Sequence, residues 1–119
     1  MREGVRGVTK ARRWDALLLS IVFYVVMAAP IVLSADTVTV SQRDRTFFPD
    51  SLQLAPGSVV HIVNDDKVTH HIYVDSPEMK FDSGEQPVGT TVDLRFDKPG
   101  TFDVQCAIHP TMHLQVTVK

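Results

Sequence analysis

The sequence predicts an all-β protein built as a β-sandwich, and three observations lead to that fold class. From residue 36 onward, apolar residues alternate with polar ones in short runs. Turn-forming pairs such as Pro56-Gly57 and Pro99-Gly100 separate those runs. No stretch after residue 36 repeats its apolar residues with the period of a helix. Alternation of period two marks strands with one buried face, and about seven such strands joined by turns are typical of a sandwich.

The predicted strands follow one another along this part of the chain. Successive strand residues point to opposite sides of a sheet, so Phe102, Val104 and Cys106 share one face, which should point into the core. Residues 76–89 contain two prolines and two glycines and are predicted to form a long loop. Strands are expected within residues 36–42, 51–64 (two strands), 70–74, 90–96, 101–106 and 113–118.

The N-terminal segment has a different character. Residues 2–13 carry five basic residues, residues 16–33 are almost entirely apolar, and a short stretch of small and polar residues follows. This order is typical of a secretory signal peptide, with cleavage after Ser34 or Ala35. The alternative is an uncleaved membrane anchor, because 18 residues are near the lower limit for a transmembrane helix. We therefore expect residues 1–35 to be a signal peptide or anchor, and residues 36–119 to be a periplasmic domain.

The composition of residues 36–119 narrows the function further. They hold seven basic and 12 acidic residues, a net charge of −5 with neutral histidines, and no basic cluster that would favour nucleic acid. A small domain in an oxidising compartment often contains disulfides, but a single cysteine cannot form one internally. Cys106 is thus either an inert buried thiol or a metal ligand, and a metal would also stabilise the fold.

The stretch "CAIHPTM" favours the metal. Cys106, His109 and Met112 are spaced by three residues on the turn between two predicted strands. Thiolate, imidazole and thioether together select copper among the first-row metals, whereas zinc rarely uses methionine. A blue-copper site needs a second histidine, and the candidates are His70 and His71. Alternation alone does not choose between these two, because the start of a strand can be irregular.

From Phe48 to Val118 the chain resembles the cupredoxins, the family of plastocyanin, pseudoazurin and amicyanin. The segments that carry the resemblance are "FFPDSLQLAPGSVVHIVND", "VTHHIYVD", "FDSG" and "KPGTFDVQCAIHPTM". The two-residue spacings from Cys106 to His109 and from His109 to Met112 are similar to those of amicyanin. The resemblance implies a Greek-key β-sandwich and places His70 on the first ligand position. It departs from the family at His71, where asparagine is usual, so this ring either replaces the asparagine's hydrogen bond or competes for the metal.

The resemblance also implies a function. One copper ion per chain would be held by His70, Cys106, His109 and Met112 and would cycle between Cu(I) and Cu(II). The protein would then shuttle single electrons, with no catalytic residues, and would not be an enzyme. Partners such as a dehydrogenase or a c-type cytochrome are expected to dock near Ile108, His109 and Pro110 on a monomer. The alternative is a protein that buffers or delivers copper, with the remaining histidines assisting: His61, His71 and His113.

Overall fold

A computed structural model of the chain describes residue 4, residues 28–30 and residues 34–119. The predicted signal peptide or anchor over residues 1–35 lies almost entirely outside the described residues and stays a prediction. Within the described ranges, no helix is both long enough and apolar enough to cross a membrane. Contacts divide the chain into Met1–Pro30 and Ile31–Lys119, and every strand described belongs to the second unit.

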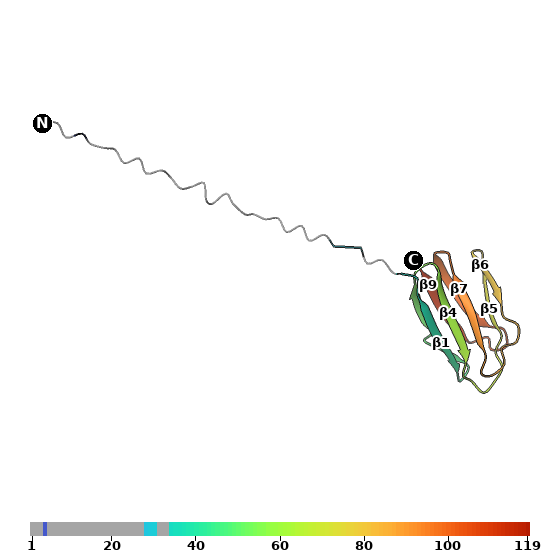
Figure 1. Cartoon of the computed structure of the whole chain (residues 1–119). Helices are drawn as coiled ribbons and strands as arrows, with labels where there is room; N and C mark the ends of the chain where they lie inside the picture. Colours follow the sequence, from blue (N-terminus) through green and yellow to red (C-terminus); the bar gives the residue numbers. More distant parts are fainter. Residues whose placement is uncertain (1–3, 5–27, 31–33) are drawn as a thin grey trace. The chain divides into compact units, whose positions relative to one another are not determined.

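The second unit is a sandwich of two mixed β-sheets (Figure 1). One sheet has four strands in the order β2-β1-β4-β7, and the other has five in the order β3-β9-β8-β5-β6. The predicted fold class is therefore confirmed. The nine strands among the described residues are β1 (Thr37–Arg43), β2 (Thr46–Phe48), β3 (Ser51–Leu54), β4 (Ser58–Asn64), β5 (Ile72–Ser76), β6 (Met79–Asp82), β7 (Thr91–Phe96), β8 (Gly100–Cys106) and β9 (His113–Val118).

Two strands were not expected from the sequence. Strand β6 lies inside residues 76–89, so the prediction of one continuous loop there is wrong. Pro77 does not break the pairing, because it occupies a two-residue turn that leaves Ser76 opposite Met79. Beyond this turn, Met79 and Phe81 are partly buried and pack against the core. The other unexpected strand, β2, is only three residues long and buries Phe47.

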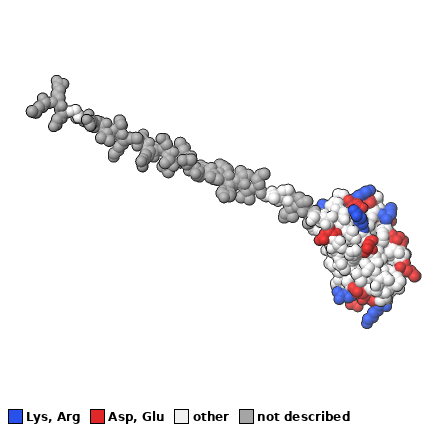
Figure 2. Space-filling model, in the orientation of Figure 1, with Lys and Arg blue, Asp and Glu red and all other residues white. Residues whose placement is uncertain are grey.

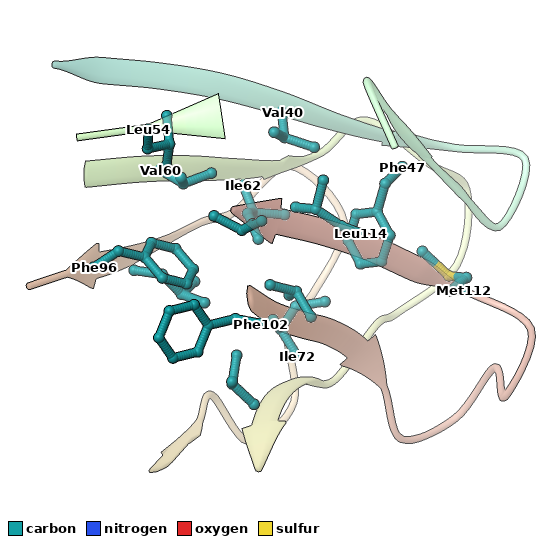
Figure 3. Packing of buried hydrophobic residues seen from close by; sticks show 14 of the residues in the cluster. Val40, Phe47, Leu54, Val60, Ile62, Ile72, Phe96, Phe102, Met112 and Leu114 are labelled. Atoms are coloured by element: carbon teal, nitrogen blue, oxygen red, sulfur yellow. The ribbon is translucent and has the colours of Figure 1, made fainter. Parts of the chain in front are cut away.

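Buried and exposed residues alternate along the strands, and the buried residues together form the core. In β4 every second residue is buried, including Val60 and Ile62, because these side chains face the opposite sheet. The core continues along the inner faces of both sheets (Figure 3), where the rings of Phe96 and Phe102 pack with centroids 5.4 Å apart. Close packing of this kind holds the strand ends, and the residues attached to them, in fixed positions.

The strand pairing brings the candidate ligands to one end of the sandwich. Strand β8 ends at Cys106, and β9 begins at His113. The turn between them, residues 107–112, therefore carries His109 and Met112. Strand β5 pairs with β8 so that Ile72 is opposite Cys106, which places His70 at the same end.

Charged side chains are spread over the domain. On the face seen in Figure 2, acidic and basic residues are interspersed rather than gathered into a single-sign patch. This face therefore offers no surface of one charge sign, although residues 36–119 carry a net charge of −5.

Candidate metal centre

Three side chains converge at this end of the sandwich: His70, which precedes β5, and Cys106 and His109, which lie at the end of β8 and in the turn after it. His70 is 0% exposed and Cys106 is 2% exposed, while the His109 ring is partly exposed. His70 and Cys106 are positioned by different elements of the fold. His70 precedes β5 and is held by two backbone hydrogen bonds with Gln86, of 3.0 and 2.7 Å. Cys106 is the last residue of β8, on its inward face as predicted.

The distances between the donor atoms fit one metal ion. His70 Nδ1 lies 3.7 Å from Cys106 Sγ, His109 Nδ1 lies 3.6 Å from the same sulfur, and the two nitrogens are 3.2 Å apart. The point equidistant from all three atoms of a triangle with these sides lies about 2.0 Å from each atom. Metal–imidazole bonds are about 2.0–2.1 Å and metal–thiolate bonds about 2.3 Å. The three donor atoms therefore lie at distances at which they could hold one metal ion.

Met112, the fourth candidate, lies at the same end of the core. Its side chain is buried, at 1% exposure, and Figure 3 places it at one end of the labelled core residues. The Met112 backbone N–H donates a 3.0 Å hydrogen bond to the carbonyl of His109, which tightens the turn between them. Met112 would be the candidate for a fourth ligand, because copper accepts a thioether beside thiolate and imidazole. The assignment of the four side chains as ligands stays a prediction.

The sulfur atom is also fixed by the neighbouring strand. The backbone N–H of His71 donates to Cys106 Sγ at 3.4 Å, and the His71 carbonyl accepts a 2.8 Å hydrogen bond from the N–H of Ala107. These two contacts lock the end of β8 to the start of β5. An N–H aimed at the sulfur also stabilises the thiolate, which is the form that binds metals.

Asp66 determines how the His70 ring is oriented. His70 Nε2 lies 3.0 Å from Asp66 Oδ2. An ionised carboxylate only accepts hydrogen bonds, so Nε2 carries a hydrogen, and in the neutral ring the lone pair of Nδ1 then faces Cys106. Carboxylate partners of this kind fix the tautomer of metal-binding histidines. No sequence motif marked Asp66 as part of the site; the available signal was an acidic residue four positions before a candidate histidine.

The charge state of Asp66 follows from its surroundings. Burial by itself raises the pKa of this carboxyl, whose side chain is 9% exposed. Hydrogen bonds from the backbone N–H groups of Arg45 and Lys67, and from His70, outweigh burial and lower the pKa from 3.8 to about 2. Asp66 is thus ionised at neutral pH and remains an acceptor for His70.

The surroundings of His109 favour its neutral form. Burial lowers the pKa of His109 first, and the electrostatic influence of the neighbouring His70 and Arg45 lowers it further, partly offset by Asp66. A lowered pKa means that the neutral imidazole persists to more acidic pH than usual. Because only the neutral ring has a lone pair for a metal, this shift favours ligation.

Asn64 supports the loop that delivers His70. Its side-chain amide donates hydrogen bonds to the carbonyls of Val68 and Gln86, at 2.9 and 3.0 Å. Its side-chain oxygen accepts a 3.0 Å hydrogen bond from the N–H of Asp66. One buried residue at the end of β4 therefore connects the loop before His70 with the segment that pairs with His70.

The other histidines do not join this group of donors. His71, the alternative left open by strand alternation, turns its Nε2 toward Asp82 Oδ1 on β6, at 2.6 Å. His113 contacts both carboxylate oxygens of Asp103, and His61 contacts Asp93. His61 is partly exposed and His113 is exposed, so both rings lie at the surface.

Comparison with known proteins identifies the family. Residues 34–119 match the model for copper binding proteins of the plastocyanin/azurin family. No curated protein sequence matches the chain.

Solved structures with the same fold include several cupredoxins. A purple cupredoxin from Nitrosopumilus maritimus is 23% identical, with a TM-score of 0.62, over 69% of this chain and 99% of that one. A mutant of amicyanin in its reduced state is 20% identical, with a TM-score of 0.65, over 70% and 82% of the two chains.

A copper-containing enzyme also matches. The nitrite reductase of Thermus scotoductus SA-01 is 26% identical, with a TM-score of 0.64, over 70% of this chain. The match spans only 22% of the length of that reductase. The family model covers most of the chain, the fold agrees with amicyanin, and the sulfur and two imidazoles meet at metal-binding distances. The chain therefore belongs to the plastocyanin/azurin family of copper-binding proteins, and its cofactor is copper.

Proposed function

We propose that the chain is a type 1, or blue, copper protein that carries single electrons between redox proteins. Cys106 would supply the thiolate, His70 and His109 the two imidazoles, and Met112 the axial thioether for one copper ion. Copper bound by such a set supplies a one-electron couple between Cu(I) and Cu(II). The observation that carries this proposal is the cluster of Nδ1 and Sγ atoms, 3.2–3.7 Å apart and mostly buried.

The rigidity of the donor set supports electron transfer. Strand pairing holds Cys106, the Gln86 backbone holds His70, and the His109–Met112 hydrogen bond holds the turn. Donor atoms held in this way move little when the charge of a bound ion changes. When the two oxidation states have nearly the same structure, the barrier to gaining or losing one electron is low.

The surface beside His109 supports a transient protein partner. Ile108 is 49% exposed and Pro110 is exposed, so an apolar surface adjoins the partly exposed His109 ring. We propose that dehydrogenases or c-type cytochromes dock here with a small interface, as weak redox encounters do. The net charge of −5 favours cationic partners and makes association sensitive to salt. We propose that the protein acts as a monomer.

The location is proposed from the N-terminal segment. A basic stretch, an apolar stretch and small residues precede residue 36, which supports export to the periplasm. Retention of residues 16–33 would anchor the domain to the membrane. Fractionation of cells, with N-terminal sequencing of the recovered protein, separates cleavage from retention.

The two other functional classes have weaker support. Copper buffering or delivery would be assisted by additional histidines, but His61, His71 and His113 each contact a carboxylate. An enzymatic role is suggested only by the nitrite reductase, of which this chain spans 22%. We propose that the protein is not an enzyme.

Two measurements test the proposal. The protein with Cu(II) should have an intense visible absorption band from the copper–thiolate bond, which Cys106→Ala removes and Met112→Ala only shifts. Electron self-exchange, followed by NMR on mixed Cu(I) and Cu(II) samples, should proceed without loss of metal. Slow self-exchange, together with rapid copper transfer to a chelating peptide, would instead identify a delivery protein.

The docking surface has its own test. Ile108→Asp should slow electron transfer to a c-type cytochrome at least about 10-fold, because it places a charge in the apolar contact, and should leave the spectrum unchanged. Thr101→Asp is the control, since Thr101 is exposed near the start of β8, at the other end of the strand from Cys106. Equal slowing by both variants would argue against a surface centred on Ile108.

A further inference from the structure

One oxygen atom of Asp66 connects the metal centre to a distant turn. Asp66 Oδ2 accepts a hydrogen bond from the backbone N–H of Arg45 at 2.8 Å and another from His70 Nε2 at 3.0 Å. The other carboxylate oxygen accepts the Lys67 N–H at 2.7 Å. With its side chain 9% exposed, Asp66 lies between the β1–β2 turn and the His70 ring.

The β1–β2 turn has an unusual backbone. Arg43 pairs with Thr46, which leaves Asp44 and Arg45 as a two-residue loop. Both residues are in the left-handed region, with φ of 51° and 55°. This turn type normally contains asparagine and glycine, and a long side chain such as arginine is uncommon there. A residue in this conformation persists only where surrounding contacts hold it.

The contact that holds the turn is also the contact that holds Asp66. In its left-handed conformation, Arg45 donates its N–H to the same oxygen that orients His70. A second contact lies beside the first, because the Ser41 hydroxyl donates to Asp65 Oδ2 at 2.6 Å. Residues 65 and 66 therefore attach the loop before His70 to the end of the first hairpin.

We propose that the β1–β2 turn is a positioning element of the copper centre, acting through Asp66 to keep His70 Nδ1 directed at Cys106. Neither Asp66 nor the turn supplies a predicted ligand. Their role is to fix the tautomer and the direction of the ring before the metal binds, as outer hydrogen-bond partners do for other metal-binding histidines. Because coupling between two sites is reciprocal, copper on His70 should in turn steady Arg45.

Amide hydrogen exchange in the unaltered full chain tests this coupling. Loading with Cu(I) should slow exchange of the Arg45 amide at least about 10-fold relative to the copper-free protein. The Glu78 amide is the internal reference, since it lies in the two-residue β5–β6 turn and should not change. In Asp66→Ala, the response of Arg45 to Cu(I) should disappear. Equal Arg45 exchange with and without copper would overturn the proposal.

A change in turn length tests the same inference without metal. Insertion of one glycine between Asp44 and Arg45 moves the Arg45 N–H while keeping Asp66 and His70. In the copper-free protein, the His70 Nε2–H signal should then exchange with water at least about 10-fold faster. The matched insertion, between Pro77 and Glu78, should have no effect on that signal. An unchanged His70 signal in both insertions would refute the role of the turn.

The two experiments remain informative under other outcomes. If the Asp44–Arg45 insertion prevents folding, the Arg45 exchange measurement on the unaltered chain still decides the question. Both readouts report on Asp66, Arg45 and His70 rather than on electron transfer. A failure of the proposed shuttle function would therefore leave this inference standing, and the reverse is also true.

Discussion

The five histidines of this chain occupy two regions, and they differ in what their rings contact. At the end of the core, His70 and His109 each direct Nδ1 to the sulfur of Cys106, at 3.7 and 3.6 Å. On the outer surfaces, the rings contact carboxylates and not the sulfur, and these histidines are His61, His71 and His113. The same residue type thus serves as a candidate ligand at the end of the core or as a partner of a carboxylate at the surface, depending on its place in the fold.

His70 and His71 make the comparison sharpest because they are adjacent in the chain. The His70 side chain is fully buried beside the sulfur, whereas the His71 side chain points to Asp82 on β6. His71 still serves the site through its backbone, which donates an N–H to the sulfur. Copper binding is therefore expected to depend strongly on the side chain at position 70 and much less on the side chain at position 71.

The largest expected effect tests this pair directly. His70→Ala should weaken copper binding more than about 100-fold, because loss of a ligand exceeds the roughly 10–100-fold cost of losing a partner outside the ligand set. His71→Ala should change the affinity by less than about threefold, since its backbone N–H remains. Competition with a Cu(I) chelator measures both, and circular dichroism confirms folding. Similar losses in the two variants would mean that the wrong histidine is assigned.

The next effect compares the carboxylates that contact the two kinds of histidine. Asp66→Ala should weaken copper binding about 10–100-fold, because His70 loses the acceptor that fixes its tautomer. Asp103→Ala removes the partner of His113 at the surface and should alter the affinity by less than about threefold. An Asp66 variant with unchanged affinity would show that the ring is oriented by packing alone.

A smaller effect concerns the stability of the copper-free protein in acid. The pKa of Asp66 is lowered from 3.8 to about 2 in the folded state. Its contribution is therefore fully present above pH 3.8 and is lost as the pH falls through 2. Solvent beside the carboxylate screens the interaction, so we expect about 1–2 kcal/mol.

Urea unfolding of the copper-free protein between pH 5 and about pH 2 measures this contribution. The difference in unfolding free energy between the unaltered chain and Asp66→Asn should shrink as the pH falls. Asp103→Asn is the control, because Asp103 lies at the exposed surface beside His113. A difference that stays constant with pH for Asp66→Asn would contradict the lowered pKa.

Local sequence signals were sufficient for most of the fold. Alternating apolar residues marked β4, β7, β8 and β9 because each strand has one face in the core. They did not mark β2 or β6, which are three and four residues long. The three residues of β2 contain too few alternations to stand out. In β6, Met79 and Phe81 do alternate, but the prolines and glycines of residues 76–89 favoured a loop.

The candidate site also has some residues that the sequence predicted and others that only the structure revealed. Cys106, His109 and Met112 lie within seven residues, so their spacing alone indicated a shared metal. The contribution of Asp66 was hidden because it needs the fold of residues 65–70 and an N–H from Arg45, 21 residues earlier in the chain. The alternation of side chains along a strand did not decide which of His70 and His71 is the ligand, because β5 begins only at Ile72, after both histidines.

The smallest expected effect lies on the outer surface. His61 contacts Asp93 across the β4–β7 pair, with side chains 36% and 62% exposed. Exposed pairs contribute little because water and salt screen them, so Asp93→Asn should lower the unfolding free energy by less than about 0.5 kcal/mol. Urea unfolding at low salt and at about 1 M salt measures the change, which should vanish at high salt. A loss above about 1 kcal/mol at both salt concentrations would mean that the outer pairs stabilise the sandwich, and the distinction between the two regions would then concern metal binding alone.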